Sequence, residues 1–293
     1  MIVACVGDIM LDVIVDLPDG LVLDDDTPAH VTFAAGGQAA NVAGWVHEYG
    51  GTARLFGPRA ARGPGQFVDE ALEAAGIEVH GPITGRAGTV VSLVSQGARS
   101  LASDPGSSSW LEEVAPGPWL EGADWLFVSG YALFRAPRPE VLVELASAAR
   151  SIGIRVAVDL SSAALINVFG PARFRELWQA LRPAVVLANE HEWAATYTAS
   201  ASDGPHEAPV TGYGAGGQSV LVLKQGPKGC SFVIDGVEDH RLPVPGPVLD
   251  ATGAGDALAA GFLLGGPDLA MKAAARCVAQ VGAQPHTLLP DSP

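Results

Sequence analysis

The stretch VLDATGAGDALAAGF (Val248–Phe262) joins a cluster of acids and glycines to an alanine-rich apolar run. Its apolar part is typical of a buried helix, and a helix that only has to pack needs one capping residue at its start. Here Asp250 and Asp256 flank a turn that also contains Gly253 and Gly255. The crowding of acids and glycines is therefore more than packing requires.

Two interpretations of this helix start are open. In the first, the backbone N–H groups of Gly253–Gly255 and the positive end of the helix bind an anion. Asp256 would then lie beside the anion and accept a proton from a hydroxyl that attacks a phosphoryl group. In the second, Asp250 or Thr252 is an ordinary N-cap and the glycines only form the turn.

The composition excludes several classes of protein. The chain has 293 residues, 48% of them hydrophobic, which is enough to bury a substantial core. Its net charge of −15, from 17 basic and 32 acidic residues, argues against nucleic acid or an anionic membrane as the main partner. No apolar run is long enough to predict a membrane span.

The cysteines and the first residues bear on localisation. Cys5, Cys230 and Cys277 lie far apart and show no C-x-x-C spacing, which predicts reduced, buried thiols and not a disulfide framework or a zinc site. The apolar beginning of the chain is interrupted by Asp8 and Asp12 and has no basic segment before it. It is interpreted as a first strand and not as a signal peptide, so we expect a cytoplasmic protein.

Short apolar runs alternate with helical patterns along the chain, which predicts an α/β fold with a doubly wound, mostly parallel sheet flanked by helices. The predicted strands are Ile2–Val6, Val13–Val15, Ala53–Phe56, Thr89–Ser95, Trp125–Ser129, Val156–Leu160, Val185–Ala188, Val220–Lys224 and Cys230–Ile234. The predicted helices are Ala39–Tyr49, Phe67–Ala75, Glu140–Ser151, Ala172–Leu181, Asp256–Leu264 and Leu269–Val281.

Two segments interrupt this alternation. Residues 12–33 and 88–103 alternate apolar with small or polar residues, as strands with one solvated face do. We expect them to form a small sheet that stands off the main one. The whole chain, residues 1–293, is otherwise expected to form a single domain.

Residues 199–217 are poor in large apolar side chains and predict a loop. Gly212, Gly214 and Gly217 within it match the spacing G-x-G-x-x-G of dinucleotide-binding proteins. That fingerprint requires a strand before the glycines and a helix after them. Here the predicted strand Val220–Lys224 follows, so the match does not predict a dinucleotide site.

Two motifs lie at the ends of predicted strands in the second half of the chain. Asn189 and Glu192 have the spacing of a capping box, although the same groups could hold the water molecules of a magnesium ion. Lys224 ends a strand, and Gly226 and Gly229 follow it. These glycines either form an ordinary hairpin turn or let the backbone approach a nucleotide.

A glycine pair precedes the first predicted helix. Gly36 and Gly37 would let a ligand approach the backbone, and Asn41 in the first turn could reach a polyol; otherwise the pair is a plain turn with a solvated Asn. Asp12 lies in an apolar strand, where an unpaired buried carboxylate is costly. It therefore either binds a donor or lies on the solvated face of the strand.

Taken together, these motifs resemble the ribokinase-like (PfkB-type) carbohydrate kinase family over nearly the whole chain. DATGAGD (250–256) matches the D-T-x-G-A-G-D signature of that family except at its second residue. GGQAAN (36–41) resembles its glycine-pair and Asn motif, NEHE (189–192) its N-x-x-E motif, and KQGPKG (224–229) its G-x-x-G turn. The four motifs occur in the order of the family.

The resemblance implies an ATP-dependent kinase that uses Mg²⁺, with the small sheet as a lid and as the contact of a homodimer. Asp256 would be the general base, and Gly253, Ala254 and Gly255 would form the anion hole. Asp12, Gly36, Gly37 and Asn41 would bind the acceptor. Asn189 and Glu192 would organise Mg²⁺ through water, and Lys224, Gly226 and Gly229 would line the nucleotide site together with Asn189 and Glu192. Asp250 and Thr252 match positions that bind a monovalent cation such as K⁺ in some members.

The chain departs from the family at the acceptor positions. Ribokinases proper carry Lys and Gly where this chain has Gln38 and Ala39. The G-A-N that many sugar kinases have after the lid strand is replaced by a segment that begins at Gly106. A D-x-N-x-R pattern is replaced by Asp159–Ala164.

The acceptor itself is left open. Few basic residues lie near the acceptor motifs, Arg99 being the main candidate, so we expect a neutral acceptor. A primary hydroxyl of a simple sugar is the leading prediction, and a nucleoside such as pseudouridine is the alternative. Tyr131 and Phe134 either stack on a base or pack in the core. A non-catalytic sugar or nucleotide sensor is the alternative from another class.

Overall fold

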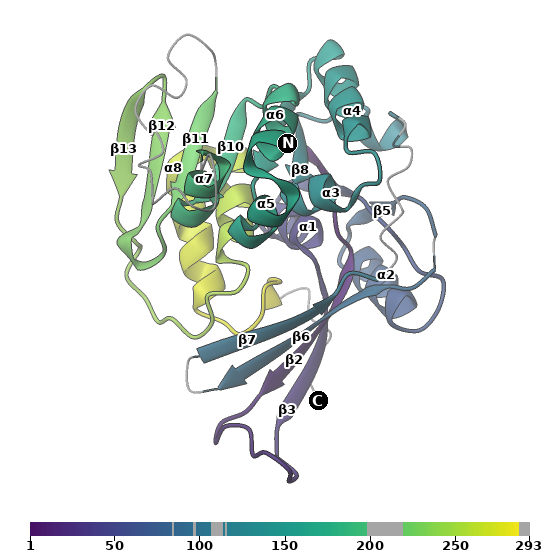
Figure 1. Ribbon diagram of the computed structural model, residues 1–293, viewed down its shortest axis with the longest axis vertical. Coiled ribbons are helices and arrows are strands. Elements are labelled where there is room, and N and C mark those ends of the chain that lie inside the picture. The colour runs from purple at the N-terminus through teal and green to yellow at the C-terminus, as the bar shows by residue number, and fades with distance from the viewer. Residues whose placement is uncertain (84, 96–97, 107–113, 115, 198–218, 287–293) are drawn as a thin grey trace.

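The computed structural model describes the chain except for residues 84, 96–97, 107–113, 115, 198–218 and 287–293. The predicted loop at 199–217 and its glycines therefore lie outside the described residues. The elements form a large sheet covered by helices on both faces and a small sheet that projects from one end (Figure 1). The predicted α/β class and the predicted separate small sheet are confirmed.

The large sheet has nine strands in the order β13-β12-β11-β10-β9-β8-β1-β4-β5. From β11 to β5 all neighbouring strands are parallel, and β12 and β13 are antiparallel additions at one edge. The strands are β1 (Ile2–Val6), β4 (Thr52–Phe56), β5 (Glu78–His80), β8 (Trp125–Ser129), β9 (Arg155–Asp159), β10 (Val185–Asn189), β11 (Val220–Lys224), β12 (Cys230–Ile234) and β13 (Val237–Arg241).

Helices cover both faces of this sheet, which is why its central strands are apolar along their whole length. The helices are α1 (Gln38–Glu48), α2 (Pro64–Ala74), α3 (Gly130–Arg135), α4 (Glu140–Ser151), α5 (Ala163–Phe169), α6 (Pro171–Ala180), α7 (Glu190–Tyr197) and α8 (Ala254–Val278), with short 3₁₀ turns at Pro118–Leu120 and Gly226–Lys228. One buried cluster joins the sheet to α1, α2 and α8, and a second joins it to α3, α4, α5, α6 and α7. None of the helices in the described part of the chain is long and apolar enough to cross a membrane.

Helix α8 consists of two helices that meet at a kink, which confirms the predicted pair. Gly265 and Gly266 have non-helical backbone angles, and Pro267 follows them. Proline cannot continue the hydrogen bonding of a helix interior, so the chain bends where the two predicted helices were separated. The second part of α8 ends at Val278, before the predicted boundary.

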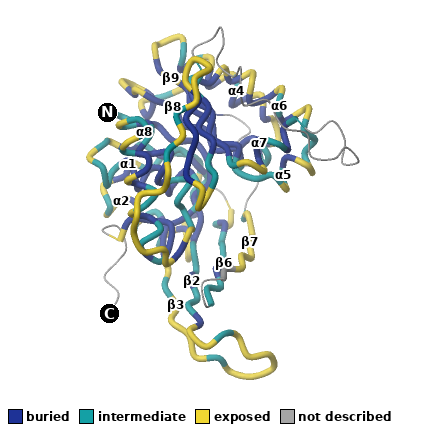
Figure 2. Tube along the Cα trace, turned by 90° about the vertical axis from the view of Figure 1, so that its left-hand side faces the viewer, coloured by how far each residue is buried: buried dark blue, intermediate teal, exposed yellow. Residues whose placement is uncertain are grey.

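The small sheet has four strands in the order β3-β2-β6-β7. They are β2 (Met10–Asp16), β3 (His30–Gly36), β6 (Gly88–Ser95) and β7 (Ala98–Asp104). β2 and β6 are parallel, and the outer pairs are antiparallel. The loop between β2 and β3 is exposed at the far end of the molecule (Figure 2).

The carboxyl ends of the parallel strands meet at one edge of the large sheet. The residues that follow β1, β8, β9, β10 and β11 therefore lie together, and α1 and α8 begin at the same edge. In open α/β sheets this edge is where ligands bind. The small sheet adjoins it (Figure 1).

Candidate active site

The turn before α8 is held by Asp250. Asp250 Oδ1 accepts hydrogen bonds from the backbone N–H of Thr252 (2.9 Å) and from its hydroxyl (2.5 Å). Asp250 Oδ2 accepts one from the backbone N–H of Gly282 (3.0 Å). These contacts hold the turn, but Gly253 is the N-cap of α8 and no side chain caps the helix, so the prediction of Asp250 or Thr252 as an ordinary N-cap is wrong. The contacts add no support for a monovalent cation.

Gly253 and Gly255 are glycines for two different reasons. Gly253 is the N-cap of α8 with φ of 73°, in the left-handed region, and a Cβ there would lie 2.7 Å from the backbone Cα of Ala283. A Cβ on Gly255 would lie 3.2 Å from Lys224 Nζ. The missing side chain at Gly255 therefore lets a lysine approach the N-terminus of α8 closely. A cationic side chain beside a helix N-terminus suits a phosphate group.

Asp256 lies in the first turn of α8 and is partly exposed. Asn41 Nδ2 donates a hydrogen bond to Asp256 Oδ2 at 2.9 Å, and Gln38 lines the same cavity as Asp256. Burial raises the pKa of Asp256 to about 7; the Asn41 bond lowers it, the charge of Asp159 raises it, and Lys224 and Gln38 lower it. A carboxyl with this pKa can accept a proton near neutral pH.

Lys224, at the end of β11, pairs with Asp159 at the end of β9. Lys224 Nζ lies 2.6 Å from Asp159 Oδ2, and the Asp159 side chain is almost completely buried. Burial lowers the pKa of Lys224, but the charges of Asp159 and Glu192 raise it further, so the net shift is upward. Lys224 therefore stays positively charged at physiological pH.

Asn189 and Glu192 form the capping box that their spacing predicts. The backbone N–H and the side-chain amide of Asn189 donate to the two oxygens of Glu192, each at 2.7 Å, and the backbone N–H of Glu192 donates to Asn189 Oδ1 at 2.8 Å. Glu192 is buried. Burial raises its pKa, the charge of Lys224 lowers it and that of Asp159 raises it.

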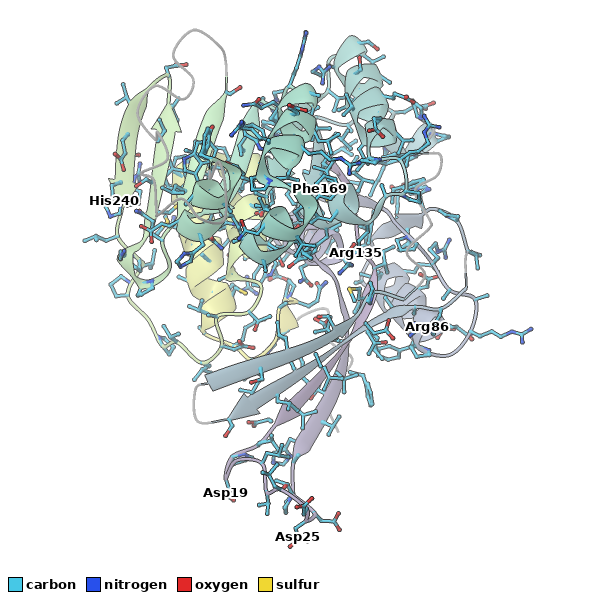
Figure 3. All side chains as sticks on the ribbon, in the orientation of Figure 1. Asp19, Asp25, Arg86, Arg135, Phe169 and His240 are labelled. Carbon is cyan, nitrogen blue, oxygen red and sulfur yellow. The ribbon has the colours of Figure 1, made fainter. Side chains whose placement is uncertain are left out.

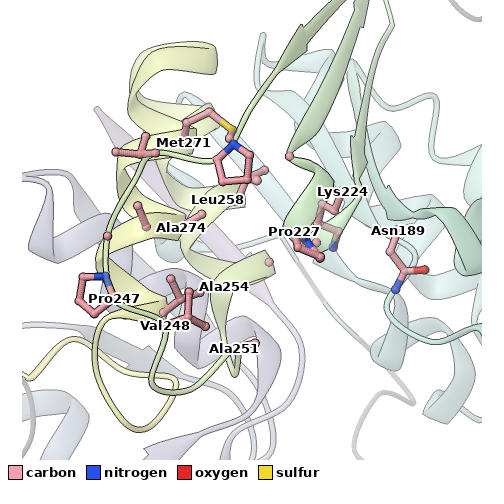
Figure 4. Close-up of a pocket in the computed structure, with 18 residues that line it drawn as sticks. Asn189, Lys224, Pro227, Pro247, Val248, Ala251, Ala254, Leu258, Met271 and Ala274 are labelled. Carbon is pink, nitrogen blue, oxygen red and sulfur yellow. The ribbon is translucent and has the colours of Figure 1, made fainter. Parts of the chain in front are cut away.

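Two cavities meet at the turn that begins α8. The larger, of about 590 Å³, has mostly apolar walls (Figure 4). Its lining is Asn189, Lys224, Gly226, Pro227, Gly229, Pro243, Val244, Gly246, Pro247, Val248, Ala251, Ala254, Gly255, Leu258, Met271, Ala274, Ala275 and Val278. Figure 4 shows Asn189 and Lys224 across this cavity from the residues of α8.

The smaller cavity, of about 280 Å³, lies between the main sheet and the small one. Its lining is Asp8, Met10, Asp12, Gly37, Gln38, Asn41, Val90, Leu101, Ser103, Tyr131, Arg135, Asp159, Ser161, Glu192, Lys224, Thr252, Gly253 and Asp256. Lys224 borders both cavities. The turn is shared as well, since Ala254 and Gly255 face the larger cavity and Gly253 and Asp256 the smaller.

The structure therefore brings the residues predicted from the sequence into two groups. Asp12, Gly37, Asn41, Glu192 and Asp256 line the smaller cavity. Lys224, Gly226, Gly229 and Asn189 line the larger one. Gly36 lines neither in the described part of the chain; a Cβ on it would lie 2.2 Å from the carboxyl carbon of Asp12. Its role is to leave room for that carboxylate.

Sequence analysis missed an ion pair in the smaller cavity. Arg135 at the end of α3 donates from Nη1 to Oδ2 of the buried Asp8 at 2.6 Å, and its guanidinium lies 5.1 Å from the centre of the Tyr131 ring. Arg135 lies between the main sheet and the small sheet (Figure 3). The expectation of few basic residues near the acceptor motifs did not include this arginine, because Asp8 and Arg135 are remote in sequence. The polar Asp8 directly after the apolar first strand was the available signal.

Tyr131 and Phe134, for which the sequence left open stacking on a base or packing in the core, have different surroundings. Tyr131 borders the smaller cavity, and burial raises its pKa to about 12. Phe134 stacks on Phe174, with ring centres 4.6 Å apart, and so packs in the core. The side chain of Arg99 and the segment after Gly106 lie outside what the structure describes.

The site also contains groups suited to a hydrated cation. Within the described residues no cluster of His, Cys, Asp and Glu is arranged to chelate a metal directly. Glu192 and Asp159 nevertheless carry carboxylate oxygens beside Lys224, at the junction of the cavities. Mg²⁺ retains several water molecules and is commonly held by one or two carboxylates together with substrate phosphates. These residues could hold Mg²⁺ through its bound water molecules. They do not form a site in which protein groups supply all the ligands of the metal.

Comparison with known proteins agrees with this architecture. A family model described as pfkB family carbohydrate kinase matches residues 2–284. No curated protein matches the chain.

Solved structures resemble the chain over nearly its full length. The adenosine kinase of Sinorhizobium meliloti is 24% identical with a TM-score of 0.81, and the match covers 97% of this chain and 95% of that one. A protein described as a probable sugar kinase of Rhizobium etli CFN 42 is 23% identical with a TM-score of 0.80, over 97% and 94% of the two chains. The ribokinase of Thermotoga maritima is 20% identical with a TM-score of 0.74, over 99% and 96%. At these identities the likeness shows a shared fold.

Proposed function

Because the chain belongs to the pfkB family of carbohydrate kinases, we propose that it transfers the terminal phosphoryl group of ATP to a primary hydroxyl of a neutral sugar. The observation that carries this proposal is the position of the turn 253–256. It separates two cavities, with Ala254 and Gly255 lining one and Gly253 and Asp256 lining the other. A kinase needs a donor site and an acceptor site that meet at the transferred group.

The larger cavity is proposed as the ATP site. Its apolar walls, which include Val244, Val248, Leu258 and Met271, suit a flat adenine ring. The helix N-terminus at Gly255 and the nearby Lys224 Nζ suit the phosphates, because both are positive. No adenine-contacting residue could be predicted from the sequence, and these four apolar residues are now the candidates for that contact.

In the proposed reaction Asp256 acts as the general base. The carboxylate takes the proton from the acceptor hydroxyl as the hydroxyl oxygen forms a bond to the γ-phosphorus and the bond from that phosphorus to the ADP oxygen breaks. The N–H groups of the turn and Lys224 stabilise the charge on the transferred phosphoryl group. Mg²⁺, when bound with ATP near Asn189 and Glu192, supplies further charge neutralisation.

The charges around the smaller cavity support a neutral acceptor. Its two described cations are already paired, Lys224 with Asp159 and Arg135 with Asp8, each at 2.6 Å. The carboxylate of Asp12 adds negative charge to the same cavity. A phosphorylated or carboxylated acceptor would meet an unfavourable field there.

A nucleoside is the second candidate acceptor, and one observation favours it. Met10, Val90 and Leu101 from the small sheet add apolar side chains to the lining of the smaller cavity. A base could pack on these side chains while the ribose faces Asp256. Two of the structures similar to this chain are described as adenosine kinases, from Sinorhizobium meliloti and Schistosoma mansoni.

The remaining features of the proposal concern the whole chain. We propose that it acts as one kinase domain, that the small sheet closes over the acceptor as a lid, and that the sheet is the contact of a homodimer. Cys5, Cys230 and Cys277 are buried free thiols, which supports a reducing, cytoplasmic location.

The test is release of ADP with Mg²⁺-ATP and a panel of D-ribose, D-fructose, fructose 6-phosphate, adenosine and pseudouridine. We expect turnover with a neutral member, and kcat/KM should rise with pH around a midpoint near 7 because Asp256 must be deprotonated. Asp256→Asn should lower kcat by at least about 100-fold. Undiminished turnover in that variant would contradict the base assignment, and binding without turnover of any acceptor would favour a sensor.

A further inference from the structure

Gln38 occupies the position where ribokinases proper have a lysine, and its amide is oriented by two serines. Gln38 Oε1 accepts hydrogen bonds from the hydroxyls of Ser129 (2.5 Å) and Ser161 (2.6 Å). Because both donors face its carbonyl oxygen, the amide nitrogen is the end that remains to face Asp256, which lines the same cavity. Ser129 is completely buried at the end of β8, so this arrangement is built into the sheet.

Asn41 shows the same arrangement from a different direction. Gln284 Nε2 donates to Asn41 Oδ1 at 3.1 Å, and Asn41 Nδ2 donates to Asp256 Oδ2 at 2.9 Å. Asn41 and Gln284 are both buried. The contact from Gln284 occupies the carbonyl end of Asn41 and leaves its amino group facing the carboxylate.

We propose that Gln38 and Asn41 are positioning residues for the Asp256 carboxylate, and that Ser129, Ser161 and Gln284 act through them by fixing which end of each amide faces Asp256. The proposal rests on the proposed role of Asp256 as the base. It adds a role for Gln38, for which the family resemblance predicts none, and it changes the role of Asn41 from binding the acceptor to holding the base.

The physical reason is that an amide side chain is ambiguous. Its two ends differ in hydrogen bonding but hardly in shape, so an unconstrained Gln or Asn could turn a carbonyl oxygen toward a carboxylate and repel it. A partner whose own donor role is fixed removes that ambiguity, as at Ser129, whose Oγ accepts the backbone N–H of Tyr131 and donates to Gln38. Two neutral donors also orient the carboxylate without the permanent ion pair that a lysine at position 38 would form, and a base paired to a lysine would accept a proton less readily.

The experiment measures the titration of the Asp256 carboxyl by ¹³C NMR in the protein without ligands, with the signal assigned from its loss in Asp256→Asn. Gln38→Met and Gln284→Met keep side-chain length and remove the hydrogen bonds. Both should shift the Asp256 titration to higher pH, by about one unit in Gln38→Met and less in Gln284→Met. Gln66→Met is the matched control, because Gln66 bonds to Glu70 at the exposed surface of α2; it should leave the titration unchanged.

Single-turnover phosphorylation of the best acceptor in the panel separates positioning from acceptor binding. If Gln38 positions the base, Gln38→Met lowers the transfer rate by about tenfold or more, moves the acidic limb of the pH profile with the NMR titration, and leaves the acceptor dissociation constant within about threefold of wild type.

Two outcomes would overturn the proposal. One is an unchanged Asp256 titration in both variants, and the other is weaker acceptor binding with an unmoved pH profile. A failure of the base assignment is distinguishable, because it appears as activity in Asp256→Asn whatever the titration of the Gln38 and Gln284 variants.

Discussion

At the scale of single residues, the properties of Asp256 follow from a competition between burial and donors. Removing a carboxylate from water disfavours its charged form, and donors restore part of that loss. Here burial outweighs the effects of Asn41 and Gln38, and the pKa of Asp256 rises to about 7. A base in this range is partly ionised at neutral pH and basic enough to accept a proton.

The same raised pKa predicts how stability depends on pH. Between about pH 4 and pH 7 the folded protein keeps a proton on Asp256 that the unfolded chain has lost, so the contribution of Asp256 to stability falls as the pH rises through this window. Asp256→Asn removes this loss. The free energy of unfolding of this variant minus that of wild type should therefore rise by about 1–3 kcal/mol from pH 5 to pH 8.

Urea denaturation at the two pH values measures this difference. Asp235→Asn, at an exposed turn where the side chain is solvated, is the matched control and should show no such trend. A constant difference between Asp256→Asn and wild type at both pH values would contradict the raised pKa.

At the scale of elements, the N-terminus of α8 is where packing and proposed chemistry coincide. Asp250 accepts hydrogen bonds within the turn, Gly253 gives it a left-handed residue, and Gly255 lets Lys224 Nζ approach the helix N-terminus. Of the two interpretations of the sequence, the ordinary N-cap at Asp250 or Thr252 is wrong, because Gly253 is the N-cap. Thr252, Gly253 and Asp256 line the smaller cavity instead.

Gly253→Ala tests this turn. A left-handed alanine costs about 1–2 kcal/mol, and its Cβ would also lie 2.7 Å from the backbone of Ala283, which adds about 1–3 kcal/mol. Gly50→Ala is the matched control, with φ of 76° and nothing within 4 Å of the added Cβ. Chemical denaturation should show the larger loss for Gly253→Ala; equal losses would mean that the turn relaxes freely.

Glu192→Gln separates the two roles considered for the N-x-x-E motif. Gln serves at this position of a capping box, so the free energy of unfolding should change by less than about 1 kcal/mol. If the charge of Glu192 also holds hydrated Mg²⁺, the Mg²⁺ concentration for half-maximal rate should rise by about tenfold, since one charge-assisted contact is lost. An unchanged Mg²⁺ requirement would leave Glu192 with the capping role alone.

At the scale of the whole molecule, the two sheets meet around the smaller cavity. The small sheet contributes Met10, Asp12, Val90, Leu101 and Ser103 to its lining. Its outer surface keeps large apolar side chains such as Val31 and Phe33 about half-exposed. Because these apolar side chains are only partly buried, we expect the hydrogen bonds of the small sheet to open more easily than those of the core strands.

Hydrogen exchange measures this difference. We expect amides of β2 and β6 to exchange faster than those of β9 and β10 in the free protein, and to slow by about tenfold or more when an acceptor and a non-hydrolysable ATP analogue are both bound. The ATP analogue alone should protect the N-terminus of α8 and leave β2 and β6 unchanged. Protection of the small sheet by the analogue alone would contradict its proposed role as a lid over the acceptor.

The sequence predicted the strands and most helices because their signals are local. Continuous apolar runs identified the buried strands, the change to alternation at 12–33 and 88–103 identified the separate sheet, and Gly265–Pro267 separated two helical patterns. The two edge strands of the large sheet were missed: β5 (Glu78–His80) because it has only three residues, and β13 (Val237–Arg241) because it is polar and largely exposed. The helices α3, α5 and α7 were missed because they are too short for a clear helical period.

By itself the sequence determined the α/β class, the family resemblance and the turn at 253–256, since each rests on residues that are neighbours along the chain. Only the tertiary structure decided what surrounds Asp256. Gln38 and Asn41 come from α1, Asp159 from β9 and Lys224 from β11, and the sheet brings them to one edge because its parallel strands all end there. The pKa of Asp256 depends on that assembly, because burial and charge act through space and leave no local pattern in the sequence.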